Sequence, residues 1–239
     1  HCNIKTNVFF NTMKVCVLGS GGFLGKNLME TSYEKSEKWV GITRNDLDLM
    51  NQCAVINFFK QNNFDAVIHC GASINQNDEA TTFKNITMFE NVVRAFSGKL
   101  IYFSSGAALR GNPPSDPYGL AKWVIDHRLR TMKNTHILRI WGCYGPHELE
   151  TRFSAVCKRD KHVIIKRDKY FDYVHVATVC EVVRKCIYGE ITEKEINISG
   201  RAARLLSKWA VIFGATYEII DEDTLDDSYV NLDDEILCI

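Results

Sequence analysis

A short apolar run that ends in three evenly spaced glycines constrains the fold of this chain most. Residues 14–18 read KVCVL, and Gly19, Gly22 and Gly25 follow within the stretch VCVLGSGGFLGKNL. This order predicts a buried strand, a tight turn and a helix, in which the second glycine lets a pyrophosphate approach the backbone and the third lets helix and strand pack closely. The phosphates would then meet N–H groups at the helix N-terminus. The stretch therefore predicts dinucleotide binding rather than a plain turn.

Apolar runs alternate with helical stretches along most of the chain. The expected strands cover residues 14–18, 39–43, 66–69, 100–103, 136–140 and 171–176, with a later one in EINISG. The expected helices cover residues 24–32, 55–61, 81–97, 118–132, about 177–188 and 203–213. This alternation favours an α/β fold, a Rossmann-type doubly wound parallel sheet over residues 13–146. The more polar and basic texture beyond residue 146 predicts a small C-terminal substrate lobe, 147–239, that is interleaved with the sheet.

Composition narrows the class of protein. Lys plus Arg and Asp plus Glu both number 29 among 239 residues, so no net field favours nucleic acid or an anionic membrane. The longest apolar runs are too short to span a bilayer. Nine scattered cysteines without a C-x-x-C pair favour buried thiols in a reducing compartment over disulfides or zinc. We therefore expect a cytoplasmic protein with no metal, nucleic-acid or membrane partner.

The two ends of the chain carry separate expectations. Residues 1–12 lack a starting Met and a signal-peptide pattern, which predicts an N-terminal extension or tag remnant before a natural start at Met13. The acidic stretch IDEDTLDDSYVNLDDE near the other end is predicted to be a solvated surface or a loose tail.

The stretch SSGAALRGNPPSDPYGLAK carries the residues most suited to catalysis. Ser104 and Ser105 end an expected strand, and Tyr118 and Lys122 follow at a spacing of four residues. Residues i and i+4 share one helix face, so the Lys122 ammonium is expected to lower the pKa of the Tyr118 phenol and to hold a cofactor ribose. With a serine hydroxyl on the same substrate oxygen, the set would move a proton on or off a carbinol while hydride passes to or from nicotinamide.

These motifs resemble a known family. The spacing G-x-x-G-x-x-G with Phe23-Leu24-Gly25, followed by Ser and Tyr-x-x-x-Lys, resembles the extended short-chain dehydrogenase/reductase superfamily, specifically its nucleotide-sugar epimerase/dehydratase branch. The segments ILRIWGCYGP, FDYVHVATVCEVV and EINISG also resemble that branch. For the cofactor the resemblance implies Gly19, Gly22, Phe23, Leu24, Gly25, Asp48, Leu49, Cys70, Gly71, Ala72, Ser104, Tyr118 and Lys122. For the substrate it implies Asn85 and Tyr144, and it implies a homodimer through helices near 85–97 and 118–132. Relatives often place an arginine where Phe171 stands here, so the diphosphate contact is expected to be shifted, with Arg152 as the candidate.

The identity of the catalytic serine depends on the alignment. Relatives that read SGAxY select Ser105, with Ser104 as the second candidate. Counting back from Gly111 selects Gly106 instead, and a glycine has no side chain that could act. Ser105 is therefore the predicted catalytic serine, beside Tyr118 and Lys122.

The tip of the second expected strand bears on the cofactor. An acid there would bind the ribose hydroxyls of NAD, whereas a basic residue suits the additional phosphate of NADP. Arg44 stands at this tip, within GITRNDLDL, and favours NADP. A solvated surface arginine is the alternative interpretation, which leaves NAD as the alternative cofactor.

Departures from the family pattern narrow the reaction. Dehydratases of the branch follow the serine with an Asp-Glu pair, and epimerase-reductases resembling GDP-fucose synthase use a cysteine there and a later histidine. Gly106, Ala107 and Ala108 stand at these positions, which disfavours both chemistries. The prediction is an NADP(H)-dependent reduction of a 4-keto-6-deoxy sugar nucleotide, with Arg152 in the basic stretch 152–169 on the diphosphate. The alternatives are an NAD-dependent nucleotide-sugar 4-epimerase and a noncatalytic dinucleotide-binding sensor.

Overall fold

A parallel sheet forms the centre of the computed structural model, which describes residues 13–31, 37–200, 203–221, 228–232 and 236–239. Its strands are β1 (Met13–Leu18), β2 (Glu37–Ile42), β3 (Ala66–His69), β4 (Lys99–Ser105), β5 (Thr135–Ile140), β10 (Glu195–Ile198) and β13 (Leu237–Cys238). They lie in the order β13-β10-β5-β4-β3-β1-β2, and each neighbouring pair is parallel. The predicted α/β doubly wound fold is confirmed, whereas the predicted extension 1–12 lies outside the described residues.

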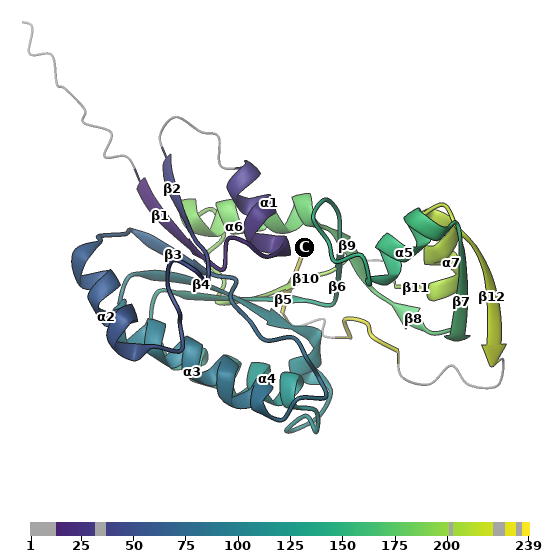
Figure 1. Ribbon diagram of the computed structural model, residues 1–239, viewed down its shortest axis with the longest axis horizontal. Helices are drawn as coiled ribbons and strands as arrows, with labels where there is room; N and C mark the ends of the chain where they lie inside the picture. Colours follow the sequence, from purple (N-terminus) through teal and green to yellow (C-terminus); the bar gives the residue numbers. More distant parts are fainter. Residues whose placement is uncertain (1–12, 32–36, 201–202, 222–227, 233–235) are drawn as a thin grey trace, which may run out of the picture.

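Helices cover both faces of the sheet (Figure 1). One face carries α1 (Phe23–Thr31) and α6 (Val176–Tyr188), and the other carries α2 (Gln52–Gln61), α3 (Ala80–Ala95) and α4 (Pro117–Arg130). Successive strand side chains point to opposite faces, so Val15 and Val17 join the core beneath α1 and α6, while Cys16 and Leu18 join the core beneath α2 to α4. Burial on both faces explains why the strands are continuous apolar runs.

The strand order reverses between β1 and β3. From β1 the chain adds β2 on one side and then crosses to the other side, where β3, β4, β5 and β10 follow outward. Such a reversal opens a crevice at the carboxyl ends of the strands, and ligands of doubly wound sheets bind there. The Leu18 carbonyl accepts a hydrogen bond from the Cys70 amide at 2.9 Å, which joins the ends of β1 and β3 at this point.

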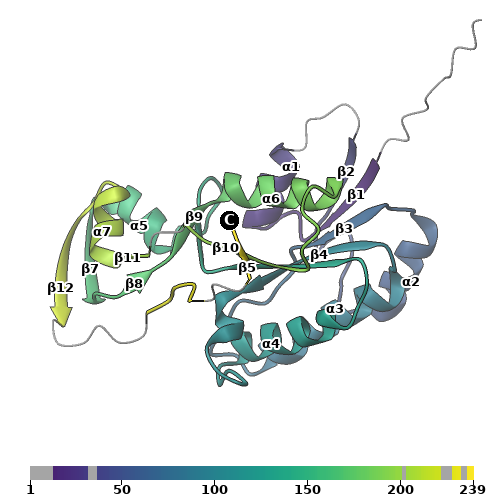
Figure 2. The same ribbon diagram turned by 180° about the vertical axis from the view of Figure 1, so that it is seen from behind.

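A small lobe lies beyond the carboxyl edge of the sheet (Figure 2). Its elements are α5 (Phe153–Asp160), β7 (His162–Arg167), β8 (Tyr170–Phe171), β11 (Arg204–Leu205), α7 (Leu206–Ile212) and β12 (Thr216–Asp221). Two further strands, β6 (Gly142–Tyr144) and β9 (Tyr173–His175), pair with each other and join the lobe to the sheet. An aromatic cluster that contains Tyr173, Trp209 and Phe213 forms the lobe's own core.

The structure differs from the sequence predictions in two segments. Residues 147–170, to which no element was assigned, contain α5 and β7. The prediction of a solvated or loose acidic end is wrong for the described parts of that end. Asp221 ends β12, which pairs with β7, and Tyr229 pairs with Phe171 of the lobe. Backbone pairing in both places overrides the charge pattern on which the prediction rested.

The described ranges hold neither a membrane-spanning helix nor a cluster of metal-binding side chains. None of their helices has the length and hydropathy that a bilayer crossing requires. In the same ranges, no three His, Cys, Asp or Glu side chains gather as a metal site would need.

Candidate active site

A cavity of about 480 Å³ lies where the strand order reverses. Its walls come from the glycine turn after β1, the tip of β2 and the loop after β3. The predicted cofactor residues on these walls are Gly19, Gly22, Arg44, Asp48, Leu49, Cys70, Gly71 and Ala72. The structure therefore brings together most of the predicted cofactor set. Phe23 and Leu24 instead begin α1 and pack against the core.

The glycines of the turn have different structural roles. Gly19 has φ +79°, and a Cβ there would lie 2.7 Å from the Gly71 amide nitrogen. A Cβ at Gly25 would lie 2.6 Å from the Cα of Ser20. Around Gly22 the nearest atom to such a Cβ is the Gly19 carbonyl oxygen at 3.4 Å, so Gly22 has space toward the cavity. This backbone cradle fits a dinucleotide pyrophosphate.

The tip of β2 presents a basic group to the same cavity. Asp46 is held by its own turn, because its carboxylate accepts hydrogen bonds from the Thr43 amide at 2.8 Å and the Thr43 hydroxyl at 2.6 Å. These hydrogen bonds lower the pKa of Asp46. Arg44 is exposed and lines the cavity. The exposed Asp48 and buried Leu49 line it as well.

Ser105 lies at the carboxyl end of β4, where a single turn of 3-10 helix, η1 (Gly106–Leu109), begins. Its hydroxyl accepts a hydrogen bond from the Ala107 amide at 3.2 Å and lies 2.8 Å from the hydroxyl of Tyr229. Ser104 is the preceding strand residue and takes the opposite face. Its hydroxyl lowers the pKa of Asp126 on α4, away from Ser105.

Tyr118 stands in the first turn of α4. Asp116 caps this helix by accepting the Gly119 amide at 2.7 Å, and Pro117 occupies the first position, where its missing N–H costs nothing. Burial raises the pKa of Tyr118 to about 12, and the hydroxyl of Ser105 and the charge of Arg152 only partly oppose this rise. The phenol is therefore protonated at neutral pH and suited to donate a proton.

Lys122 is buried behind the tyrosine. Its ammonium donates to the Tyr102 hydroxyl at 2.9 Å and to the Phe103 carbonyl at 2.6 Å, and it lies 5.6 Å from the centre of the Tyr118 ring. Burial lowers the pKa of Lys122 to about 8, although Asp126 favours the charged form. The expectation that Lys122 lowers the pKa of Tyr118 is wrong in this arrangement, because burial of the phenol dominates and the ammonium points to other partners.

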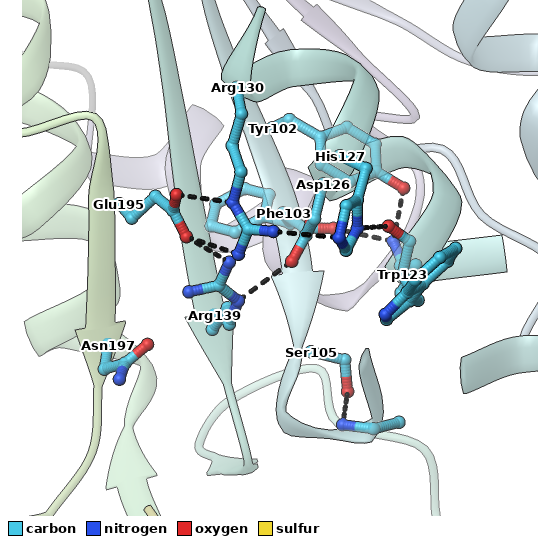
Figure 3. Close-up of polar contacts among 12 residues, drawn as sticks. Tyr102, Phe103, Ser105, Trp123, Asp126, His127, Arg130, Arg139, Glu195 and Asn197 are labelled. Carbon is cyan, nitrogen blue, oxygen red and sulfur yellow. Dashed lines mark hydrogen bonds and ion pairs between the residues drawn. The ribbon is translucent and has the colours of Figure 1, made fainter. Parts of the chain in front are cut away.

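A buried charge network continues from Lys122 into the sheet (Figure 3). Asp126, one turn further along α4, accepts a hydrogen bond from Arg139 of β5 at 2.8 Å. Arg139 also pairs with Glu195 of β10, which Arg130 contacts at 2.7 Å. Burial alone would raise the pKa of Glu195, but hydrogen bonds from Arg130 and Arg139 lower it to about 2. Burial raises the pKa of Asp126 despite its arginine partner.

Two of the three predicted substrate residues, Asn85 and Tyr144, contact other parts of the protein. Asn85 is buried in α3, where its side-chain oxygen accepts from the Ser73 amide at 2.7 Å and its side-chain nitrogen donates to the Ser73 carbonyl at 2.9 Å. It therefore supports the cavity wall through the backbone of Ser73. The Tyr144 ring packs in the lobe, with ring centres 5.0 Å from Phe213 and 5.1 Å from His175.

Arg152 is the predicted substrate residue whose charge influences Tyr118. It precedes α5, donates to the Cys143 carbonyl at 3.4 Å and places its guanidinium 5.6 Å from the centre of the Phe23 ring. Its charge lowers the pKa of Tyr118. Arg152 thus provides a positive charge between the start of α1 and the catalytic end of the sheet.

Three residues of the site were absent from the sequence predictions. Asp126 follows Lys122 by four residues, so helical spacing alone could have found it. Tyr102 contacts Lys122 from β4, and Tyr229 contacts Ser105 from a segment more than a hundred residues away. These two contacts depend on tertiary structure and leave no local pattern in the sequence.

Comparison with protein families agrees with this geometry. The model of the family described as "NAD dependent epimerase/dehydratase family" matches residues 15–198. That range includes the glycine turn, Ser105, Tyr118, Lys122 and the elements through β10, and it ends before Tyr229.

Individual proteins give a similar result. A GDP-6-deoxy-D-talose 4-dehydrogenase of Aggregatibacter actinomycetemcomitans is 26% identical over 217 residues, which cover 78% of this chain and 74% of that protein. The structure of a dTDP-4-dehydrorhamnose reductase of Bacillus anthracis in complex with NADP has a TM-score of 0.77 at 18% identity, covering 87% of this chain and 84% of the other. A UDP-N-acetylglucosamine 4-epimerase of Bacillus cereus has a TM-score of 0.73 at 19% identity, covering 92% of each chain. These two structures share the fold.

Proposed function

The chain belongs to the NAD-dependent epimerase/dehydratase family, and from this premise we propose that it is an NADP(H)-dependent oxidoreductase that reduces the 4-keto group of a nucleotide-linked 6-deoxy sugar. One observation carries the proposal. Ser105 ends β4 and Tyr118 stands in the first turn of α4, the serine hydroxyl lowers the pKa of that phenol, and no acid stands in the turn that follows the serine.

Tyr118, Ser105 and Lys122 have different roles in the proposed reduction. A reduced nicotinamide, when bound, supplies the hydride for the carbonyl carbon. Tyr118 donates its proton to the carbonyl oxygen as that oxygen gains charge, and its raised pKa keeps the proton available at neutral pH. Ser105 hydrogen-bonds the same oxygen and orients it. Lys122 places a positive charge behind the phenol and fixes the end of β4 through the Phe103 carbonyl.

The turn after the serine argues against dehydration. A Cβ at Gly106 would lie 2.5 Å from the Cδ1 atom of Trp141, so the indole occupies the space that a side chain there would need. Ala107 and Ala108 are buried and carry no group that could take up a proton. The site therefore offers one acid/base phenol and a serine, which suffice for simple redox chemistry at a carbinol carbon.

Arg44 supports NADP as the cofactor. Arg44 is exposed and lines the cavity at the tip of β2, where the additional phosphate of NADP would need a positive charge. The nearby carboxylate of Asp46 is bound to Thr43, and Asp46 is not among the residues that line the cavity. The NADP complex of the structurally similar reductase is consistent with this choice.

The small lobe supports a nucleotide diphosphate on the substrate. A second cavity of about 310 Å³ is lined by Lys166, Arg167 and Lys169 beside the apolar Phe153 and Leu206. We propose that the part of residues 147–239 that lies outside the central sheet is the substrate lobe, with Arg152 at its start and the basic cavity further along. Cations suit the diphosphate and the apolar wall suits a base. The similar dehydrogenase from Aggregatibacter, whose name contains a GDP-linked 6-deoxy sugar, agrees with this class.

A 4-epimerase that retains NAD is the second candidate. The same Ser105 and Tyr118 would serve oxidation followed by re-reduction, and the structure of the Bacillus cereus 4-epimerase shares the fold over 92% of this chain. Arg44 on the cavity wall at the tip of β2 is what places the reductase first.

The test begins with the nucleotide in the purified protein and with NADPH oxidation across a panel of 4-keto nucleotide sugars. We expect exchangeable NADP and turnover of at least one 4-keto-6-deoxy sugar. Tyr118→Phe should lower kcat by at least about a hundredfold, whereas Tyr188→Phe, which removes a hydroxyl from an exposed tyrosine at the end of α6, should leave kcat unchanged. Retained NAD without net NADPH consumption would favour the epimerase, and full activity of Tyr118→Phe would refute the mechanism.

A homodimer through α3 and α4 completes the proposal. The two helices lie side by side, joined by Arg128 and Glu90 at 3.2 Å, and Phe83 on α3 is 66% exposed. Light scattering should give a dimer that Phe83→Asp weakens, and a monomer at all concentrations would refute it. Cell fractionation tests the accompanying assignment to the cytoplasm.

A further inference from the structure

The hydrogen bonds of Ser105 raise a question about its proton. A hydroxyl has one hydrogen to donate and two lone pairs to accept with. The Ala107 amide donates to one lone pair at 3.2 Å, and the Tyr229 hydroxyl lies 2.8 Å away. If Tyr229 donates to the second lone pair, both lone pairs of the serine oxygen are occupied. The serine hydrogen must then point along the one tetrahedral direction that remains, and it is available to a further acceptor.

Tyr229 is held so that its hydroxyl must meet Ser105. Its amide donates to the Tyr170 carbonyl at 2.9 Å, and its carbonyl accepts from the Asp172 amide at 3.0 Å, so its backbone is paired on both sides with the lobe. Its ring packs on Phe171, with ring centres 5.2 Å apart. The guanidinium of Arg110, from the loop after η1, lies 4.3 Å from the ring centre. The phenol is therefore fixed by the lobe on one side and by the serine's own loop on the other.

The charge state of Tyr229 suits a donor. Burial raises the pKa of its phenol, against smaller opposing effects from Ser105 and Arg110. The hydroxyl keeps its proton at neutral pH and can donate it continuously to the serine oxygen. Ser105 also lowers the pKa of Tyr118, so the serine influences both phenols.

From this geometry we propose that Tyr229 is a positioning residue that donates its hydroxyl hydrogen to Ser105 and thereby directs the serine proton at the substrate oxygen. The proposal rests on the proposed function, in which Ser105 hydrogen-bonds that oxygen. It extends the site to a segment beyond the family match, which ends at residue 198. It also makes the position of the small lobe a condition for correct alignment of the serine.

A double-mutant cycle tests the proposal in the reductase assay. Tyr229→Phe keeps the ring and removes the donor, so we expect kcat to fall about three- to tenfold with KM within about twofold, the size of one neutral hydrogen bond. In a Ser105→Ala background the same substitution should cause no further loss, because the residue it acts through is gone. If the fold-loss in kcat of the double variant equals the product of the losses of the two single variants, the proposal is refuted. It is also refuted if Tyr229→Phe changes KM alone.

A second measurement needs no turnover and separates this proposal from the proposed function. In protein labelled with ¹³C at the tyrosine ζ carbon, the Tyr229 signal is the one missing from Tyr229→Phe. We expect Ser105→Ala to shift that signal and Ser104→Ala, on the opposite face of β4, to leave it in place. An unmoved signal in Ser105→Ala would refute the contact. If Ser105→Ala shifts the signal but the unmodified protein reduces no 4-keto sugar, the contact between Tyr229 and Ser105 stands. In that case the proposed function is refuted, and the positioning role with it.

Discussion

The two ends of the candidate site are built in different ways. The cofactor end uses the backbone of one continuous turn, in which Gly19 and Gly25 lie against neighbouring backbone atoms. The catalytic end uses side chains that arrive from separate elements: Ser105 from β4, Tyr118 from α4 and Tyr229 from near the C-terminus. The geometry of the cofactor end depends on which positions are glycine, whereas the geometry of the catalytic end depends on packing between segments that are distant in the sequence. Substitutions should therefore act on the two ends by different physical routes.

The largest effect is expected in the charge network behind the catalytic end. Arg139→Met leaves Asp126 buried without its partner, which should lower the free energy of unfolding by about 3–5 kcal/mol in a denaturant titration. Adding Asp126→Leu should recover part of this loss, since the carboxylate that lost its arginine is removed as well. The matched control is Arg128→Met, because Arg128 pairs with Glu90 at the surface and should cost less than about 1 kcal/mol. Equal losses for the two arginines would mean that the network contributes no more than a surface pair.

Acid should act through the same network. The pKa of Glu195 falls from its usual 4.5 to about 2 in the folded protein. Its ionised form therefore stabilises the fold fully above pH 4.5, by about 3 kcal/mol, and this contribution is lost as the pH falls from 4.5 to 2. Unfolding followed between pH 7 and pH 2 should show a shallower decline in Glu195→Gln than in the unmodified protein. Glu150→Gln, at a side chain that is 90% exposed, should follow the unmodified curve.

At the cofactor end, the prediction concerns space rather than charge. The Cβ of Gly25→Ala would collide with the Gly19–Ser20 backbone, so the turn must open. We expect dinucleotide affinity to fall about a hundredfold, equivalent to about 2.7 kcal/mol, in a calorimetric titration. Gly189→Ala is the control: Gly189 has φ +77° but nothing within 4 Å of its Cβ. That variant should lose about 1 kcal/mol of stability and no affinity. Unchanged affinity in Gly25→Ala would contradict the backbone cradle.

The smallest effect is expected from Arg44. Its guanidinium is exposed, so Arg44→Ala should weaken NADP binding only about tenfold and leave NAD binding unchanged. The quantity to measure, by titration of each variant, is the ratio of NADP affinity to NAD affinity, which should fall about tenfold in Arg44→Ala. Equal weakening of both cofactors would place Arg44 on the shared part of the dinucleotide and remove the argument for NADP.

Much of the cofactor end could be predicted from the sequence, because its determinants are local. The run KVCVL before Gly19 specifies a strand, a turn and a helix within a dozen residues, and the structure has β1 and α1 there. The order of Ser105, Tyr118 and Lys122 along the chain likewise predicted which elements meet. Asn85 shows the limit of such reasoning, because its position on α3 was foreseen but its bonds to the backbone of Ser73 were not.

The rest depends on contacts that sequence patterns do not encode. In β7 the alternating burial of Val163 and Ile165 is a strand pattern, but five basic residues between 158 and 167 obscured it. Tyr229 lies in a strongly acidic stretch, where charge suggested solvent and the backbone instead pairs with the lobe. Whether Lys122 would meet Tyr118 or Tyr102 depended on side-chain directions at the end of β4, which only tertiary structure settles.

The indole of Trp141 has a consequence for the order in which this site can change over generations. Because the ring fills the space beside Gly106, a serine, threonine or acid at position 106 is sterically blocked while the tryptophan is present. Any lineage that gains such a residue must first, or simultaneously, acquire a smaller one at position 141. The two positions are thus epistatic, and saturation libraries at 106 should yield folded variants mainly in a background where Trp141 has been reduced.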